Sequence, residues 1–367
     1  MRAIRIQQFG GPEAMGLEEL PTPKPGDGQA LVRIEAAGVN FIDVYQRTGL
    51  YKNPLPYGLG LEGAGVVEAV GPGVRSLAPG DPVVIGLYAA CGECPECRSG
   101  RIERCAGTAR NNNMIGLMPD GSTRHSLRGR PVHPMVGAGT LAEYALVREP
   151  QAVKIPAEIP LDLACLAGCG VTTGVGAVFN AARVAPGSSV AVLGCGGVGL
   201  NVVQAARVAG AARIVAVDAQ AAKLDLAHDL GATDLVLVEP DEPASARILA
   251  IAPGGVDFAF EVVGSPALVR EAFLATRAGG TTVMVGSPRP GDEIALDARH
   301  LLIDRRVVGT VGGGNVPQRD IPRIMELVRT GRLDLAKLVS QRLPLERVQE
   351  AFSALEEGKL ARTVVVF

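Results

Sequence analysis

The feature that most constrains this chain is a group of four cysteines inside fifteen residues. They follow one another at intervals of three, three and eight positions, as Cys91, Cys94, Cys97 and Cys105. Tetrahedral Zn²⁺ takes four ligands, with sulfur at about 2.3 Å, and short C-x2-C steps bring thiolates to one point. Because all four ligands would be thiolates, no position is left for water or substrate. The spacing therefore predicts one structural zinc, in a lobe at about residues 88–108.

Two disulfides in a secreted loop are the alternative for these cysteines. The first residues of the chain have neither the basic segment nor the apolar segment of a secretory leader. Disulfides are rare in the cytosol, and Cys165, Cys169 and Cys195 add three further thiols without an evident partner. We therefore expect a cytoplasmic protein with a zinc site. Cys165 and Cys169, four positions apart, are expected on one helix.

The net charge and the length of the chain narrow the possible partners and the number of domains. The net charge of −2 provides no basic face, so we expect neither nucleic acid nor a membrane as partner. Residues 184–206 are uncharged and of membrane length, but proline and glycines interrupt them, which favours a buried strand and helix. A length of 367 residues predicts two domains.

The pattern of elements changes near residue 160. Before it, short strands such as 30–35, 65–70 and 82–85 are separated by Pro-Gly turns, which is typical of a barrel or sandwich. After it, strands alternate with helices, which predicts an α/β fold with a doubly wound parallel sheet. The expected strands are 189–193, 213–217, 234–238, 256–260, 281–285 and 306–311, and the expected helices are 198–208, 221–230, 244–250 and 266–276. A helix at 321–330 and a strand-like tail at 363–367 are too short to form a domain, so we expect them to pack on the first one.

A glycine fingerprint follows the first of these α/β strands and opens a helix. It has the G-x-G-x-x-G spacing of dinucleotide sites, in which the helix N-terminus binds the pyrophosphate. The residues expected at the cofactor are Gly194, Gly196, Gly197, Val198 and Gly199.

Asp218 lies nineteen residues after Gly199, at the end of the second strand. A carboxylate there can accept hydrogen bonds from the adenine ribose and repels a 2′-phosphate, so NAD(H) is favoured over NADP(H). The alternative role for Asp218 is a cap on the following helix. The other residues expected at the cofactor are Thr173, Lys223, Val263 and Arg362.

With the lobe upstream of this fingerprint, the chain resembles the medium-chain dehydrogenases/reductases. Segments 120–125, 128–133, 168–174 and 361–367 are similar to zinc-type alcohol dehydrogenases, whereas 38–51 and 60–67 are similar to zinc-independent quinone oxidoreductases. The resemblance implies an enzyme with an N-terminal GroES-like, β-rich catalytic domain and a Rossmann domain. We expect the first at 1–160 and 312–367, the second at 161–311, and a homodimer or homotetramer.

The catalytic zinc of the alcohol dehydrogenases has no complete counterpart here. In that family a cysteine, a histidine and a second cysteine bind this metal, with a glutamate beside the histidine. The first two positions are Asn40 and Leu61, so only Cys169 and Glu62 remain. Two ligands fall short of the three that catalytic sites usually have. None of the four histidines matches the missing ligand, and His125 and His133 are expected in a loop after the lobe.

Without that metal, we expect hydride transfer to a quinone or an α,β-unsaturated carbonyl, in which conjugation spreads the developing charge. The residues expected at this small-molecule site are Asn40, Asp43, Tyr45, Glu62 and Cys169. Asn40 and Tyr45 would donate hydrogen bonds, with Tyr51 as a further candidate, and Asp43 would orient neighbours. An Asx-turn for Asn40 and loop packing for the tyrosines are the structural alternatives. The functional alternatives are a zinc-type alcohol dehydrogenase and a non-catalytic NAD(H) sensor.

Overall fold

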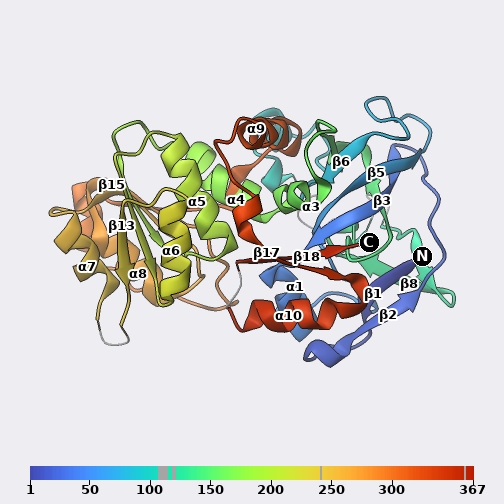
Figure 1. Cartoon of the computed structure of the whole chain (residues 1–367), viewed down its shortest axis with the longest axis horizontal. Helices are drawn as coiled ribbons and strands as arrows, with labels where there is room; N and C mark the ends of the chain where they lie inside the picture. The colour runs from blue at the N-terminus through green and yellow to red at the C-terminus, as the bar shows by residue number, and fades with distance from the viewer. Residues whose placement is uncertain (106–114, 118–120, 240–241, 359–360) are drawn as a thin grey trace. The chain divides into compact units, whose positions relative to one another are not determined.

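The structure is a computed structural model that describes residues 1–105, 115–117, 121–239, 242–358 and 361–367. Its contacts divide the chain into two compact units, which are described separately (Figure 1). Unit 1 comprises Met1–Gly170, Asn315–Thr330 and Leu338–Phe367, and unit 2 comprises Val171–Gly314 and Gly331–Lys337.

Unit 1 contains two β-sheets. In the described part of the chain, the larger has the order β10-β6-β5-β3-β18-β17, with β9 also paired to β3, and the smaller has the order β2-β1-β4-β8-β7. The larger sheet consists of β3 (Gln29–Gly38), β5 (Glu62–Val70), β6 (Pro82–Ile85), β9 (Tyr144–Arg148), β10 (Ala152–Lys154), β17 (Val339–Pro344) and β18 (Arg362–Val366). The smaller consists of β1 (Arg2–Ile6), β2 (Met15–Glu19), β4 (Tyr57–Gly58), β7 (His125–Leu127) and β8 (Arg130–Pro134). The prediction of a loop for His125 and His133 is wrong, because β7 and β8 pair as a hairpin.

The C-terminal tail forms the last strand of the larger sheet. β18 runs antiparallel to β3, with Val364 opposite Gly38, and parallel to β17. Helix α10 (Val348–Glu356) lies along β18 in Figure 1 and contacts it. Neither β17 nor α10 was predicted from the sequence. The last strand of the chain and β3, an early strand, thus lie side by side in one sheet.

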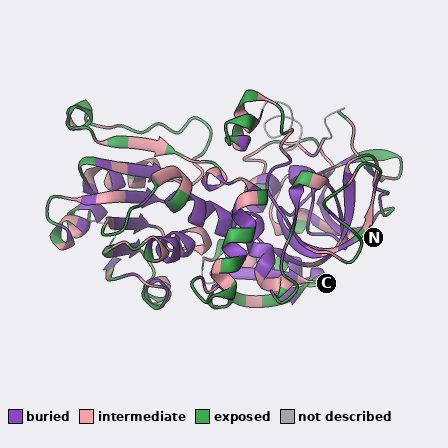
Figure 2. Cartoon of the chain, turned by 90° about the horizontal axis from the view of Figure 1, so that it is seen from above, coloured by how far each residue is buried: buried purple, intermediate pink, exposed green. Residues whose placement is uncertain are grey.

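Unit 2 is a six-stranded parallel sheet among the described residues, with the order β13-β12-β11-β14-β15-β16. Its strands are β11 (Ser189–Leu193), β12 (Arg213–Asp218), β13 (Asp234–Leu237), β14 (Val256–Glu261), β15 (Thr276–Met284) and β16 (Arg306–Gly309). Its principal helices are α5 (Gly197–Val208), α6 (Ala221–Asp229), α7 (Ala244–Ile251) and α8 (Pro266–Ala275). The central strands are buried on both faces, as parallel strands between helices must be (Figure 2). The doubly wound sheet predicted from the alternating pattern is confirmed.

The remaining helices position the sites. They are α1 (Phe41–Thr48), α2 (Pro95–Arg98), α3 (Leu161–Ala164), α4 (Gly170–Gly176) and α9 (Pro317–Arg329), with 3-10 turns at Ile102–Arg104, Cys165–Gly168 and Ala298–Ile303 and a π-helix at Ala177–Ala182. The prediction of one helix for both Cys165 and Cys169 is wrong. Cys165 begins a 3-10 turn, and Cys169 follows it with φ −144° and ψ −67°, outside the helical region.

In the part of the chain that the structure describes, no single helix is long and apolar enough to cross a membrane. One bent pair, Leu161–Gly168 with Gly170–Ala182, passes the same test by length and composition only.

Candidate functional site

The four cysteines of the lobe converge as the spacing predicts. Their sulfur atoms all lie within 4.8 Å of one another, with Cys91 Sγ 3.8 Å from Cys97 Sγ and 3.5 Å from Cys105 Sγ. Pro95 starts the short helix α2, and Cys94, its N-cap, accepts a hydrogen bond from the backbone N–H of Cys97. The local chain is thus folded around the point where the sulfurs meet.

This group is the one set of three or more His, Cys, Asp or Glu side chains in the described residues that could hold a metal ion. All seven cysteines lie in that part of the chain, and none forms a disulfide. The disulfide alternative therefore fails. Four sulfurs at this separation suit tetrahedral Zn²⁺ with no open position, which is a structural site. Residues 106–108 of the predicted lobe, and Asp120 of one motif, lie outside the described residues.

A second polar cluster in unit 1 is centred on Glu62, the first residue of β5, which is fully buried. Its Oε1 accepts hydrogen bonds from Asn40 Nδ2 at 2.9 Å and from the backbone N–H of Gly170 at 2.7 Å. Its Oε2 forms an ion pair with Arg362 of β18, and the same guanidinium donates to the carbonyl of Val39. The carboxylate therefore has three donors from distant parts of the chain.

Asn40 and Asp43 form the N-terminus of α1. Asn40 Oδ1 accepts from the N–H of Ile42, and Asp43 Oδ2 accepts from the N–H of Asn40, which is a capping box. Asp43 Oδ1 also accepts from the N–H of Gly60 at 2.8 Å. The Asx-turn and the hydrogen bond to Glu62 thus coexist in one side chain. Burial is the main cause that raises the pKa of Asp43 to about 7.

These residues do not fit a second metal ion. The Asn40 amide uses its nitrogen on Glu62 and its oxygen on Ile42. Leu61 offers an alkyl chain that is 2% exposed, and the carboxylate of Glu62 is paired with Arg362. Cys165 and Cys169 are both buried, and Cys169 directly precedes Gly170, whose N–H donates to Glu62. A catalytic Zn²⁺ usually has three protein ligands and an open position, and this cluster does not supply them.

The two candidate tyrosines pack against each other. Tyr45, on α1, meets Tyr51 edge to face, with ring centroids 5.6 Å apart and planes at 83°. Phe41, which is 44% exposed, lies one turn before Tyr45 on the same helix. Gly49 ends the helix with φ +79°, and a side chain there would collide with Phe9. Phe41 is thus exposed at the start of α1, while Tyr45 and Tyr51 are half-buried against each other.

In unit 2 the glycine fingerprint has the geometry expected of a pyrophosphate site. Gly194 has φ +100°, and a Cβ on Gly199 would lie 1.8 Å from the carbonyl oxygen of Gly194, so close helix–strand packing requires glycine there. Gly196 is the N-cap of α5, and a Cβ on it would meet no atom within 4 Å. Open space therefore lies at the N-terminus of α5, beside Gly197 and Val198, where N–H groups can bind phosphate.

Asp218 ends β12 and organises the same loop. Its Oδ2 accepts from the backbone N–H of Cys195 at 2.8 Å, and its Oδ1 accepts from the N–H of Gln220 at 3.0 Å. The N-cap of α6 is Gln220, so Asp218 does not occupy the cap position. Lys223 lies in the first turn of α6, and Thr173, which is buried, lies on α4.

Glu261 is a feature that the sequence analysis missed. It ends β14, next to Leu193 of β11, and its buried Oε1 accepts from the N–H groups of Val263, Gly264 and Ser265. Burial raises the pKa of this carboxyl. A side chain on Gly194 would meet Val263, which is half exposed. The sequence signal that could have identified Glu261 was a carboxylate at the end of the strand beside the glycine fingerprint.

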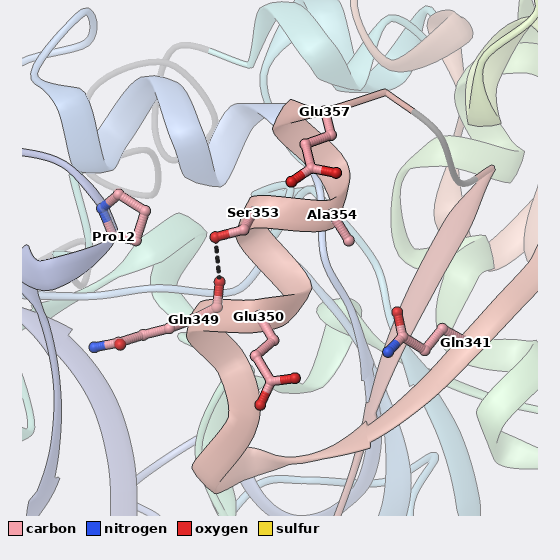
Figure 3. Close-up of a pocket in the computed structure, with 7 residues that line it drawn as sticks. All are labelled: Pro12, Gln341, Gln349, Glu350, Ser353, Ala354 and Glu357. Carbon is pink, nitrogen blue, oxygen red and sulfur yellow. Dashed lines mark hydrogen bonds between the residues drawn. The ribbon is translucent and has the colours of Figure 1, made fainter.

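A hollow of about 460 Å³ lies in unit 1, away from all these residues (Figure 3). It is lined by Pro12, Gln341, Gln349, Glu350, Ser353, Ala354 and Glu357. In Figure 3 the Ser353 hydroxyl turns back to donate to the Gln349 carbonyl of α10. None of the predicted site residues lines this hollow, so it does not bear on the reaction.

Two family models match large parts of the chain, and known proteins match its full length. The family model of the alcohol dehydrogenase GroES-like domain matches residues 26–157, and that of the zinc-binding dehydrogenases matches 197–330. An S-(hydroxymethyl)glutathione dehydrogenase of Escherichia coli is 39% identical over 370 residues, covering 100% of both chains. One from Haemophilus influenzae is 39% identical over 360 residues, 97% of this chain and 95% of the relative.

Two solved structures are similar over the full length. An alcohol dehydrogenase zinc-binding domain protein from Burkholderia ambifaria has a TM-score of 0.94 at 38% identity, covering 100% of this chain and 98% of its own. A benzyl alcohol dehydrogenase from Acinetobacter calcoaceticus has a TM-score of 0.93 at 32% identity, covering 100% of both.

Proposed function

This chain belongs to the medium-chain dehydrogenase/reductase superfamily, and from that premise we propose that it is an NAD(H)-dependent dehydrogenase that interconverts a primary alcohol and an aldehyde. One observation carries the proposal: the 39% identity to an S-(hydroxymethyl)glutathione dehydrogenase extends from end to end of both chains. The substrates in the names of that relative and of the benzyl alcohol dehydrogenase share one reacting group, a hydroxymethyl carbon. We therefore assign that group to the substrate.

The prediction of a quinone or enone substrate is wrong. Full-length relatives are named as alcohol-oxidising dehydrogenases, and they fit the functional alternative better. The physical reason lies in the segment at 38–51 on which that prediction depended. In the structure its Asn40 and Asp43 form the capping box of α1 and bind Gly60. A motif that shapes a helix start reports local structure and does not identify the substrate.

The cofactors follow from the family and from the two sites. NAD(H) supplies the hydride chemistry when bound, and the single zinc is structural, held by the four lobe cysteines. We propose that the N-terminus of α5 binds the pyrophosphate and that Asp218 accepts from the adenine ribose, with Thr173, Lys223 and Val263 nearby. Arg362 is bound to Glu62 instead, within unit 1.

The side chains around Glu62 have separate roles at the proposed substrate site. Arg362 forms an ion pair with Glu62, and Glu62 in turn accepts hydrogen bonds from the Asn40 amide and from the backbone N–H of Gly170. Asp43 fixes Gly60, one residue before the apolar Leu61. We propose that this network shapes one wall of the substrate site, with Cys169 and Tyr45 bordering it. The domain division at 1–160 with 312–367 and at 161–311 is proposed with it.

A panel assay tests this function. Protein that contains its zinc should form NADH from NAD⁺ with primary alcohols. The panel includes benzyl alcohol and a mixture of formaldehyde and glutathione, and NADP⁺ should be the poorer cofactor. Faster turnover of quinones or enones by NADH than of any aldehyde would contradict the proposal. Tight NADH binding with no turnover of any alcohol or aldehyde would favour a non-catalytic NAD(H) sensor instead.

We also propose a homodimer or homotetramer in the cytoplasm. Seven cysteines without a disulfide support a reducing compartment. The oligomeric state rests on the family resemblance, and light scattering on the purified protein measures it.

A further inference from the structure

Glu261 is a buried carboxyl group that the predicted site residues do not include. It is fully enclosed at the end of β14, and its Oε1 accepts hydrogen bonds from three successive backbone N–H groups. The donors are Val263, Gly264 and Ser265, at 2.9, 2.8 and 3.2 Å. Burial raises the pKa of this carboxyl, because the charged form loses its hydration. Glu261 thus binds one short loop, residues 263–265, from inside the protein.

This loop lies directly against the glycine fingerprint. A Cβ on Gly194 would be 2.6 Å from Val263 Cγ2, and the N–H of Val262 donates to the carbonyl of Leu193 at 2.9 Å. The half-exposed side chain of Val263 is therefore beside the turn that leads into α5. A movement of the loop would change the surface next to the proposed pyrophosphate site.

The backbone of Glu261 also fixes a second loop at the same edge of the sheet. Its carbonyl accepts from the N–H groups of Val285 and Gly286, at 2.8 and 3.0 Å. A Cβ on Gly264 would lie 2.5 Å from the carbonyl oxygen of Ser287, so the loops after β14 and β15 are in contact. One residue thus holds two neighbouring loops, the first by its side chain and the second by its backbone.

The strand order of unit 2 indicates which half of the cofactor these loops face. β12 and β13 lie on one side of β11, and β14, β15 and β16 lie on the other. A doubly wound sheet binds a dinucleotide across the carboxyl ends of its strands, at the point where the strand order reverses. Asp218 ends β12, on the side proposed for the adenosine. Glu261 ends β14, so its loop lies on the nicotinamide side.

We propose that Glu261 is a positioning residue for NAD(H), which holds residues 263–265 as the wall against which the nicotinamide half of the cofactor packs. The inference rests on the cofactor site of the proposed function. Glu261 acts through the loop, because its carboxyl is enclosed and the exposed surface belongs to Val263. The loop requires an acceptor at this position and not a charge, since its three donors are neutral N–H groups.

The test compares the binding of NADH with that of AMP, the adenosine half alone, to protein that contains its zinc. Glu261→Leu removes the acceptor and keeps most of the buried volume. The Kd for NADH should rise about 10-fold, as expected for the loss of one valine contact, whereas the Kd for AMP should stay within about twofold. Glu261→Asp, whose acceptor is one carbon farther from the loop, should show the same selective loss and serves if the first variant does not fold.

Two further variants separate positioning from general stability. Glu261→Gln keeps an acceptor for the loop and places its NH₂ where Oε2 has no partner among the described residues, so it should bind NADH as tightly as the parent. Asp257→Ala is the matched control at the opposite end of β14, where it breaks the bonds of a carboxylate with Ser189 and Arg277. It should lower the thermal midpoint and leave both Kd values unchanged.

Equal weakening of NADH and AMP binding in Glu261→Leu would assign Glu261 a structural role and overturn the inference. So would an unchanged Kd for NADH, or a Glu261→Gln variant that binds NADH as weakly as Glu261→Leu. A parent that binds NADH but turns over no alcohol or aldehyde overturns the proposed function alone, and the two Kd values still decide the role of Glu261. A parent that binds neither ligand overturns the NAD(H) site and this inference together.

Discussion

Two regions of unit 1 contain cysteines at positions where the family resemblance implies metal ligands, and they differ in what occupies the ligand positions. In the lobe, four sulfurs face one another within 4.8 Å and present an anionic set that requires a cation. Around Glu62, the side chains satisfy one another: Arg362 neutralises the carboxylate, and Asn40 donates to it. A guanidinium and an amide there do what a metal's charge does in the lobe. The comparison teaches that a buried carboxylate whose oxygens are already bound by other groups of the chain is not free to bind a metal ion.

The largest effect should come from breaking the lobe. Cys94→Ser removes one of four thiolates, so zinc per chain should fall from about one to near zero. The free energy of unfolding should drop by several kcal/mol, because metal binding is coupled to folding. Elemental analysis and thermal denaturation measure both. Cys165→Ser, outside the lobe, should keep its zinc; a Cys94→Ser protein that retains full zinc would show that three cysteines suffice.

Breaking the Glu62 cluster should have the next largest effect. Arg362→Met leaves a buried carboxylate without its cation and should cost about 3–5 kcal/mol in the free energy of unfolding. Adding Glu62→Gln to this variant should recover part of the loss, since the charge is then gone. Urea denaturation measures these changes. Arg342→Met, which breaks an exposed pair with Asp162, should cost less than about 1 kcal/mol and serves as the control.

The buried carboxyl of Asp43 should make stability depend on pH. Its folded pKa of about 7 lies above the ordinary value of 3.8 for an aspartate, so between these values the folded state holds a proton that the unfolded state has lost. The Asp43 contribution is therefore present below about pH 4 and is lost as pH rises to about 7, amounting to about 4 kcal/mol.

His125 acts with the opposite sign in the same range, because burial lowers its pKa to about 4 and its neutral form stabilises the fold at higher pH. The informative quantity is thus the difference between the parent and Asp43→Asn, each measured by urea denaturation from pH 4 to pH 7. The variant should be less stable at pH 4 and should approach the parent toward pH 7. A difference that does not change with pH would contradict the raised pKa.

The smallest effect should come from Asn40→Ala. This change removes the cap on α1 and one of three donors to Glu62, and should cost about 1–2 kcal/mol. Asn40→Asp keeps the cap but brings a second carboxylate to Glu62, so it should be the less stable of the two. Equal stability of all three proteins in urea would show that Asn40 does not support the cluster.

Several elements of the site could be predicted because their signals are local. The lobe cysteines lie within fifteen residues, and the fingerprint glycines within six. The strands and helices of unit 2 follow from apolar periodicity and match the predicted ranges to within a few residues, apart from the earlier start of β15. Glu261 stands at the end of a predicted strand, but its burial and its three backbone donors carried no such signal, because burial and hydrogen bonding are not visible in a residue name.

The sequence by itself determined the zinc lobe and the dinucleotide fold, and it has Asn40 and Leu61 where the family resemblance implies two metal ligands. Only the tertiary structure decided what replaced those ligands, since Glu62 and Arg362 are 300 positions apart and Gly170 is 108 positions from Glu62. It also decided that β17 and α10 complete the first unit. Local spacing specifies turns, caps and metal clusters, whereas the pairing of a buried charge depends on which distant strand the fold brings beside it.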